Sequence, residues 1–219
     1  MEGKFWLERW VRQDTGFHQR DVNAHLRSFW PVLGLAAGDA VFVPLCGKSG
    51  DMTWLRAQGH PVLGVELSPL AVTAFFSENG LAPQRRRQGV FDVAESDGIR
   101  IFCGDFFDLT VDDLAGMKVV YDRAALVALP PTMRERYAAH MAEILPPGTP
   151  MLLLTLEYPP AQMQGPPFSV PPSEVERLYG PRGDVRLLRR DDVLSENRLF
   201  AERGVTALYA CAFLVTLGA

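Results

Sequence analysis

Short apolar runs alternate with amphipathic or capped segments from residue 40 onward. Residues 40–44, 61–66, 118–122 and 151–156 are continuous apolar runs, which are typical of strands buried on both faces of a parallel sheet. Helical patterns at 52–58, 69–79 and 132–145 lie between these runs, and Ser68 followed by Pro69 predicts an N-cap and a proline at the first position of the second helix. The alternation predicts an α/β protein with an open, mostly parallel sheet covered by helices on both faces.

The remaining patterns extend this picture at both ends of the chain. Trp6, Trp10 and their apolar neighbours recur at helical spacing, and Asn23 is placed to cap a second helix that carries Leu26 and Trp30. Residues 91–95 and 99–103 flank an Asp-Gly pair, which predicts a hairpin. Residues 185–188 and 207–215 predict two closing strands, and no internal repeat or domain linker interrupts residues 1–219.

Three smaller features complete the local predictions. Thr132 with Glu135, and Ser173 with Glu176, match capping boxes that open helices. The basic run 85–87 is interpreted as a solvated loop.

Composition narrows the class of protein. Hydrophobic residues make up 47% and charged residues 22%, which excludes wholesale disorder. No apolar run reaches the roughly 20 residues that a bilayer span needs, and the N-terminus lacks the pattern of a secretory signal. A net charge of −4 argues against nucleic acid as a partner, and three cysteines without paired spacing favour a reducing cytoplasm. We expect a monomer without a metal site.

The turn after the first strand, Leu45-Cys-Gly-Lys-Ser-Gly-Asp51, leaves two nucleotide interpretations to weigh. A phosphate loop needs a glycine at position 42, where Phe42 stands instead. A dinucleotide turn needs three glycines to approach a pyrophosphate, and only Gly47 and Gly50 are present. Both signals are weak, so the turn by itself indicates only a tight connection from strand to helix.

Acidic, aromatic and basic residues directly follow the predicted strands, where open α/β sheets bind ligands. Glu66 ends the second strand, and a carboxylate there can accept hydrogen bonds from both hydroxyls of an adenosine ribose. Asp105 and Phe106 follow residue 103 and suit an adenine's amine and ring face, whereas Phe107 is interpreted as a core residue. Arg123 places a cation at the end of the 118–122 strand. Nicotinamide cofactors and S-adenosylmethionine both carry such a ribose, but only the latter lacks phosphates.

Motifs spread over essentially the whole chain match those of a known family. The most distinctive is Pro44-Leu-Cys-Gly-Lys-Ser49. The other matching stretches are Trp6-x-x-x-Trp10, Gly16-Phe-His18, Asp51-Met52, Trp54-Leu55, Gly59-His60, Gly64-Val-Glu-Leu-Ser68, Phe75-Phe76, Gly104-Asp-Phe-Phe107, Tyr121-Asp-Arg-Ala-Ala-Leu126, Leu156-Glu-Tyr158 and Gly165-Pro-Pro-Phe-Ser169. Together these motifs resemble the thiopurine S-methyltransferases, especially the bacterial ones.

The resemblance implies a Rossmann-like class I methyltransferase domain over residues 1–219. That fold has a mostly parallel seven-stranded sheet with one antiparallel strand near the C-terminus, and residues 1–35 would form a helical cover over the cofactor. The positions that match the family's S-adenosylmethionine contacts are Trp10, Leu45, Glu66 and Arg123, with Asp105 and Phe106 around the adenine. Phe17 matches an aromatic residue on the substrate side, and Arg198 is the nearest match to a substrate-facing arginine but is not assigned.

The function implied by this resemblance is methyl transfer from S-adenosylmethionine to the sulfur of aromatic or heterocyclic thiols. Arg123 would then also serve as the cation beside the thiolate. Selenium or tellurium compounds are further possible acceptors. Two alternatives stay open at this point: a nicotinamide-dependent oxidoreductase, which Glu66 alone permits, and a non-catalytic S-adenosylmethionine-binding module.

Overall fold

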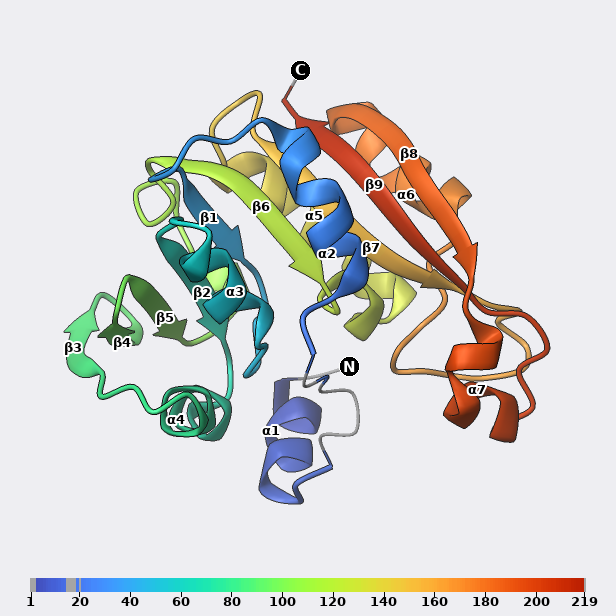
Figure 1. Cartoon of the computed structure of the whole chain (residues 1–219), viewed down its shortest axis with the longest axis horizontal. Helices are drawn as coiled ribbons and strands as arrows, with labels where there is room; N and C mark the ends of the chain where they lie inside the picture. The colour runs from blue at the N-terminus through green and yellow to red at the C-terminus, as the bar shows by residue number, and fades with distance from the viewer. Residues whose placement is uncertain (1–2, 15–18, 20, 219) are drawn as a thin grey trace. The chain divides into compact units, whose positions relative to one another are not determined.

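The computed structural model describes residues 3–14, 19 and 21–218 (Figure 1). The chain divides into two compact units. The first unit comprises residues 1–121 and the second residues 122–219. Strand β6 (Met117–Arg123) runs across the boundary. The two units are described in turn.

The first unit is an α/β unit whose strands follow the order β3-β4-β5-β2-β1-β6. Strand β1 pairs in parallel with β2 and β6, and β2 pairs in parallel with β5, so Val43, Glu66 and Cys103 end their strands at the same edge. The strands are β1 (Ala40–Val43), β2 (Val62–Glu66), β3 (Gln84–Gln88), β4 (Phe91–Ser96) and β5 (Ile99–Cys103), and the helices are α1 (Gly3–Val11), α2 (Ala24–Phe29), η1 (Trp30–Leu33), α3 (Asp51–Ala57), α4 (Pro69–Glu78) and η2 (Phe106–Asp108).

The second unit has three long antiparallel strands in the order β7-β9-β8. Its buried side chains include Leu152, Leu153 and Phe213 from the sheet and Tyr137 and Met141 from the helix that precedes β7. Its elements are η3 (Leu126–Ala128), α5 (Pro131–Ile144), β7 (Pro150–Glu157), α6 (Pro172–Tyr179), η4 (Gly180–Arg182), β8 (Gly183–Asp192), η5 (Leu194–Glu196), α7 (Arg198–Glu202) and β9 (Tyr209–Leu217).

The α/β architecture is confirmed, but the predicted strand count is wrong. The described residues form nine strands rather than seven, and antiparallel pairing is not confined to the C-terminus, because β4 is antiparallel to both β3 and β5. The basic run 85–87, interpreted as a loop, belongs to β3. Its five residues are all polar and mostly exposed, which is typical of an edge strand that avoids further pairing and is invisible to an apolar pattern.

Four of the described α-helices begin at positions where the sequence carries a capping signal or a proline. Asn23 caps α2 through bonds to His25 N and Leu26 N, and Ser68 caps α4 by accepting a bond from Ala71 N, both as predicted. The two capping boxes are wrong, since α5 and α6 begin at Pro131 and Pro172 without a side-chain cap. A proline at the first helical position needs no partner for a missing N–H, so the prolines set these starts.

No helix in the described ranges is both long and apolar enough to cross a membrane.

Candidate functional site

The turn after β1 lies against the end of β2. Cys46 N donates to Val65 O at 3.0 Å, which ties the turn to the neighbouring strand. Leu45 has a φ of 46° and Gly47 a φ of 54°, both in the left-handed region. A leucine there is uncommon and costs backbone strain, which in native proteins clusters at ligand-binding positions. Leu45, which the family resemblance implies as a cofactor contact, is held in this strained conformation.

Glu66 is the central group of this edge. It ends β2, is only 7% exposed, and both carboxylate oxygens are engaged: Oε2 accepts from Gly47 N at 2.9 Å and Oε1 from Ser68 N at 2.8 Å. Burial raises the pKa of this carboxyl, while the backbone N–H groups of Ser68, Gly47 and Leu67 act to lower it. Each carboxylate oxygen can accept a second bond, so the group can still take two donors from a ligand.

Trp10 and α1 lie on this same edge. Trp10 is buried, and a Cβ built on Gly47 would lie 3.5 Å from the Trp10 ring. At the other end of the helix, a Cβ on Gly3 would lie 2.8 Å from Leu67 Cδ2. Helix α1 therefore covers the residues that directly follow β1 and β2.

Asp105 and Phe106 follow β5 at the same edge. Gly104 N donates to Glu66 O at 3.0 Å, which fixes this connection beside Glu66. Asp105 is exposed, and its Oδ1 caps η2 by accepting from Phe107 N at 3.0 Å. Phe106 is buried, and Phe107, which was interpreted as a core residue, is only half-buried.

Sequence reasoning missed one buried acid beside the turn. Asp51, the first residue of α3, is 1% exposed and accepts bonds from Asn23 N at 2.9 Å and from the Tyr121 hydroxyl at 2.9 Å. It thereby joins the start of α2 to β6. Its partners lie 28 and 70 positions away, so no spacing signal could have identified them.

The surroundings of Cys46 and Lys48 do not support a nucleophilic cysteine or a ligand-binding lysine. Burial, with a smaller effect of the nearby Glu66, raises the pKa of the Cys46 thiol well above 9.0, so the thiol stays protonated and is a poor nucleophile. Lys48 Nζ binds both carboxylate oxygens of Glu78, at 2.7 and 2.9 Å, and so serves an ion pair in the fold.

Arg123 and Phe17 are the remaining predicted residues. Arg123 ends β6 in the second unit, is half-buried, and precedes Ala124, whose φ of 64° turns the chain sharply. Phe17 lies outside the described residues.

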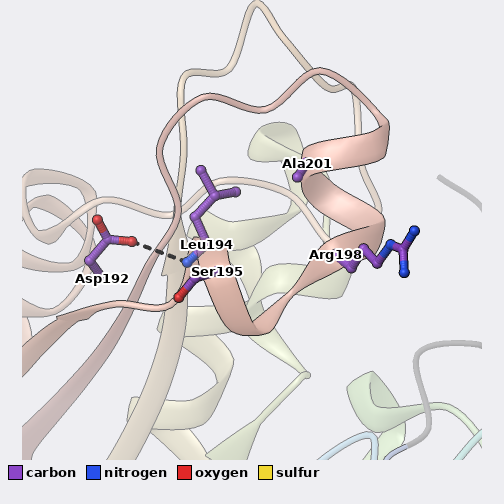
Figure 2. A pocket seen from close by; sticks show the side chains of 5 residues that line it. All are labelled: Asp192, Leu194, Ser195, Arg198 and Ala201. Atoms are coloured by element: carbon purple, nitrogen blue, oxygen red, sulfur yellow. Dashed lines mark hydrogen bonds between the residues drawn. The ribbon is translucent and has the colours of Figure 1, made fainter.

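Arg198, which was not assigned, lies exposed on α7 and donates to Glu202 at 3.0 Å. With Asp192, Leu194, Ser195 and Ala201 it lines a shallow hollow of the second unit (Figure 2).

The first unit's residues fit a nucleoside cofactor without phosphates. A buried carboxylate with spare acceptor capacity matches the two vicinal hydroxyls of a ribose, whereas its negative charge disfavours a phosphate. The only lysine of the turn is paired with Glu78. This donor and acceptor set fits S-adenosylmethionine, which has the ribose and no phosphates.

Comparisons with known proteins agree with this assignment of the cofactor. The sequence model of the family described as thiopurine S-methyltransferase matches residues 1–216. A thiopurine S-methyltransferase of Nitrosospira multiformis is 55% identical over 215 residues and covers 98% of each chain. That of Azotobacter vinelandii is 53% identical over 208 residues, or 95% of each chain.

Solved structures support the fold. A SAM-dependent methyltransferase from Methanosarcina mazei has a TM-score of 0.63 at 13% identity and covers 90% of this chain and 99% of its own. A geranyl diphosphate C-methyltransferase from Streptomyces coelicolor, solved with S-adenosylhomocysteine, has a TM-score of 0.61 at 13% identity and covers 90% of this chain and 78% of its own. The fold is therefore that of class I methyltransferases.

Proposed function

The chain belongs to the thiopurine S-methyltransferase family, and from that premise we propose that it methylates the sulfur of aromatic or heterocyclic thiols. Membership in this family makes it an S-adenosylmethionine-dependent enzyme, and the nicotinamide and non-catalytic alternatives are set aside. The single observation that carries the assignment of the site is the buried Glu66 carboxylate at the carboxyl end of β2, which accepts hydrogen bonds from Gly47 N and Ser68 N.

The reaction asks little acid–base chemistry of the protein. When bound, S-adenosylmethionine supplies an electrophilic methyl group and leaves as a neutral thioether, so no protein acid is required. The acceptor sulfur gains the methyl group, and a thiol acceptor gives up its proton to solvent. A heteroaromatic thiol ionises far more readily than an alkyl thiol, so a strong protein base is not required either.

The chain contributes binding and orientation. We propose that Glu66 holds the ribose, that Trp10 and Leu45 enclose the cofactor, and that Asp105 and Phe106 border the adenine. Fixing the thiolate in line with the methyl group is worth about 7–11 kcal/mol of the barrier. A water-poor site adds to this because a desolvated thiolate is more reactive.

Two residues are proposed for the acceptor side. Arg123 is always charged and can hold the thiolate or a ring nitrogen. Phe17 is proposed to lie over the acceptor ring. Support for both comes from the family motifs around them, since Arg123 stands in Tyr121-Asp-Arg-Ala-Ala-Leu126 and Phe17 in Gly16-Phe-His18.

We further propose that residues 1–219 act as one methyltransferase domain and as a monomer in the cytoplasm. The family match over residues 1–216 supports the first point, and the three free cysteines are compatible with a reducing compartment. Sedimentation velocity tests the monomer directly, since a dimer would sediment as a species of twice the 24.3 kDa mass.

Selenium or tellurium compounds are proposed as natural acceptors, because their anions are also soft nucleophiles. Cells that express the enzyme and receive selenite should release methylated volatile products. The Glu66→Ala variant should abolish this release. Equal release from wild type and variant would contradict the proposal.

The direct test is methyl transfer from labelled S-adenosylmethionine to 6-mercaptopurine, with the product identified by mass spectrometry. Wild type should give the S-methyl product, Arg123→Ala should be slower by roughly ten- to hundredfold through lost positioning, and Arg123→Lys should recover part of the rate. Methylation at nitrogen, or no product while S-adenosylhomocysteine binds, would contradict the proposed acceptor. Equal rates in wild type and Arg123→Ala would remove Arg123 from the mechanism.

A further inference from the structure

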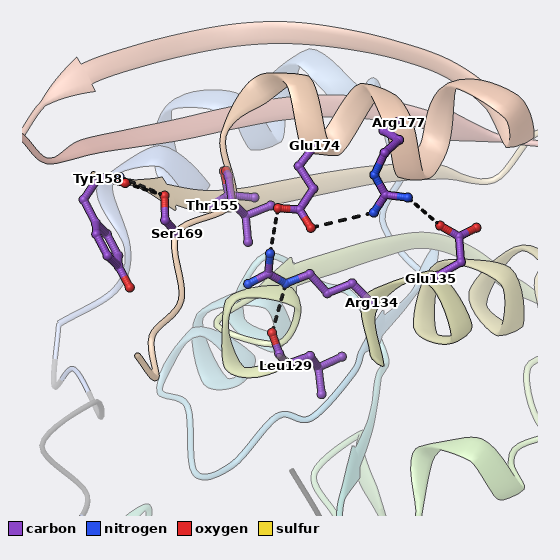
Figure 3. Close-up of polar contacts among 9 residues, drawn as sticks. Leu129, Arg134, Glu135, Thr155, Tyr158, Ser169, Glu174 and Arg177 are labelled. Carbon is purple, nitrogen blue, oxygen red and sulfur yellow. Dashed lines mark hydrogen bonds and ion pairs between the residues drawn. The ribbon is translucent and has the colours of Figure 1, made fainter. Parts of the chain in front are cut away.

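Arg134 is a buried cation that the proposed chemistry leaves unexplained. Its side chain, on α5, is 1% exposed. Nε donates to Leu129 O at 2.9 Å and Nη1 to Glu174 Oε2 at 2.7 Å, while Nη2 is buried without an acceptor among the described residues (Figure 3). Burying such a pair costs several kcal/mol per ion, and apolar side chains of similar volume often serve a core equally well. The pair is therefore poorly explained by stability alone.

The guanidinium of Arg134 packs on one aromatic ring. Its central carbon lies 5.7 Å from the centroid of the Phe168 ring, within cation–π range. Phe168 N donates to Val127 O at 2.7 Å, so the backbone of this residue is fixed to η3 as well. Arg134 and Val127 together hold Phe168 from two elements that follow β6.

The two residues that follow Phe168 are fastened to the end of β7. Ser169 Oγ accepts from Tyr158 N at 3.0 Å and donates to Tyr158 O at 2.8 Å (Figure 3). Val170 N donates to Leu156 O at 2.7 Å, and Thr155 Oγ1 donates to Val170 O at 3.0 Å. Residues 168–170 are thus a rigid segment rather than a free loop.

The position of this segment gives it a functional meaning. Val127 comes four residues after Arg123 at the end of β6, and Tyr158 directly follows β7. Ligands of open α/β sheets bind beyond the carboxyl ends of the strands. Phe168 is half-buried there, so part of this residue, whose backbone is fixed, stays accessible to a partner.

We propose that Arg134, paired with Glu174, is a positioning residue that holds the Phe168 ring as a stacking face for the planar ring of the thiol acceptor. This inference rests on the proposed function and deepens it, since it assigns acceptor selectivity to Phe168. Planar heteroaromatic thiols gain from the ring face, whereas aliphatic thiols of similar acidity do not.

Kinetics separate positioning from general stability. In Arg134→Met the KM for 6-mercaptopurine should rise roughly ten- to hundredfold, the loss expected from misplacing a positioned group, while the KM for S-adenosylmethionine stays unchanged. Arg134→Lys should recover part of the effect. Arg177→Gln is the matched control, because Arg177 is exposed, pairs with Glu135 at 2.9 Å, and lies farther from Glu174, at 3.8 Å. It should change neither KM.

Two further variants keep the test sharp. Arg134→Met with Glu174→Gln leaves no unpaired buried charge, so it should fold even if Arg134→Met alone does not, and it should show the same rise in acceptor KM. Phe168→Leu should raise that KM as well, and adding it to Arg134→Met should give little further loss, because both act through one ring.

Amide hydrogen exchange tests the positioning independently of methyl transfer. The Phe168 amide should exchange at least about tenfold faster in the double variant than in wild type, while the Cys46 amide stays unchanged. Unchanged exchange at Phe168, or equal rises in both KM values, would overturn the proposal. Failure of wild type to methylate any thiol would refute the proposed function but leave the exchange result to decide whether Arg134 positions Phe168.

Discussion

Adding one methyl group at residue 64, in β2, should displace the turn that follows β1. A Cβ on Gly64 would lie 2.7 Å from Cys46 Sγ and 3.4 Å from Met52 Sδ. Carbon and sulfur atoms in contact normally lie near 3.5–4.0 Å, so Cys46 must retreat by about 1 Å. Both residues are buried, so the overpacking in Gly64→Ala should cost about 2 kcal/mol of unfolding free energy.

The same contact predicts that a second substitution at Cys46 suppresses the effect of Gly64→Ala. Cys46→Ala removes the clashing sulfur at a cost of about 1 kcal/mol for the lost buried group. The double variant should therefore lie about 1 kcal/mol below wild type, rather than the roughly 3 kcal/mol expected from additivity. Urea unfolding of the four proteins measures this coupling. Effects that add to within about 0.5 kcal/mol would refute the packing argument.

Two other perturbations follow from single contacts. Burial raises the pKa of Asp122 from 3.8 to about 6 despite a 2.7 Å hydrogen bond from the Tyr137 hydroxyl, so the folded state holds the proton more tightly than the unfolded state. This contribution to the free energy of unfolding is present below about pH 4 and is lost as pH rises through 6. Relative to Asp122→Asn, wild type should lose no more than about 3 kcal/mol of unfolding free energy between pH 4.5 and 7, measured by urea unfolding. Equal pH slopes in the two proteins would contradict this prediction. Lys48→Met breaks the surface ion pair with Glu78 and should lower the free energy of unfolding by less than about 1 kcal/mol. The affinity for S-adenosylhomocysteine, measured by calorimetry, should stay within about threefold of wild type, and a larger loss of affinity would mean that Lys48 contacts the ligand.

Elements set by contiguous residues could be predicted from the sequence. The strand at 62–66 is a single apolar run that is buried throughout, and Glu66 was found because it stands directly at the end of that run. Ser68 followed by Pro69 marks a helix start whose two signals agree, and the cap is formed as expected. Such features depend on local chemistry, so the sequence order alone reveals them.

Features set by distant partners could not be predicted. His60 is buried, accepts a bond from Trp30 Nε1 at 3.1 Å and lies 2.9 Å from Asp39 O through Nδ1. These contacts fix the orientation of the ring, and sequence spacing alone would never pair the three residues. The buried Arg134 looks like an ordinary surface residue of an amphipathic helix until Glu174, 40 positions away, is placed against it. Long-range pairs of this kind need the fold before they can be seen.

The most direct test of the account is whether the Glu66 carboxylate binds the ribose hydroxyls of the cofactor. Calorimetry would compare S-adenosylhomocysteine with its 2′-deoxy and 3′-deoxy analogues on wild type and Glu66→Gln. Each hydrogen bond to a charged group is worth about 1.5–3 kcal/mol, so wild type should bind each analogue roughly 10- to 150-fold more weakly. Glu66→Gln should bind all three ligands with similarly low affinity. If the variant discriminated the analogues as strongly as wild type does, Glu66 would not be the ribose ligand and the assignment of the site would be wrong.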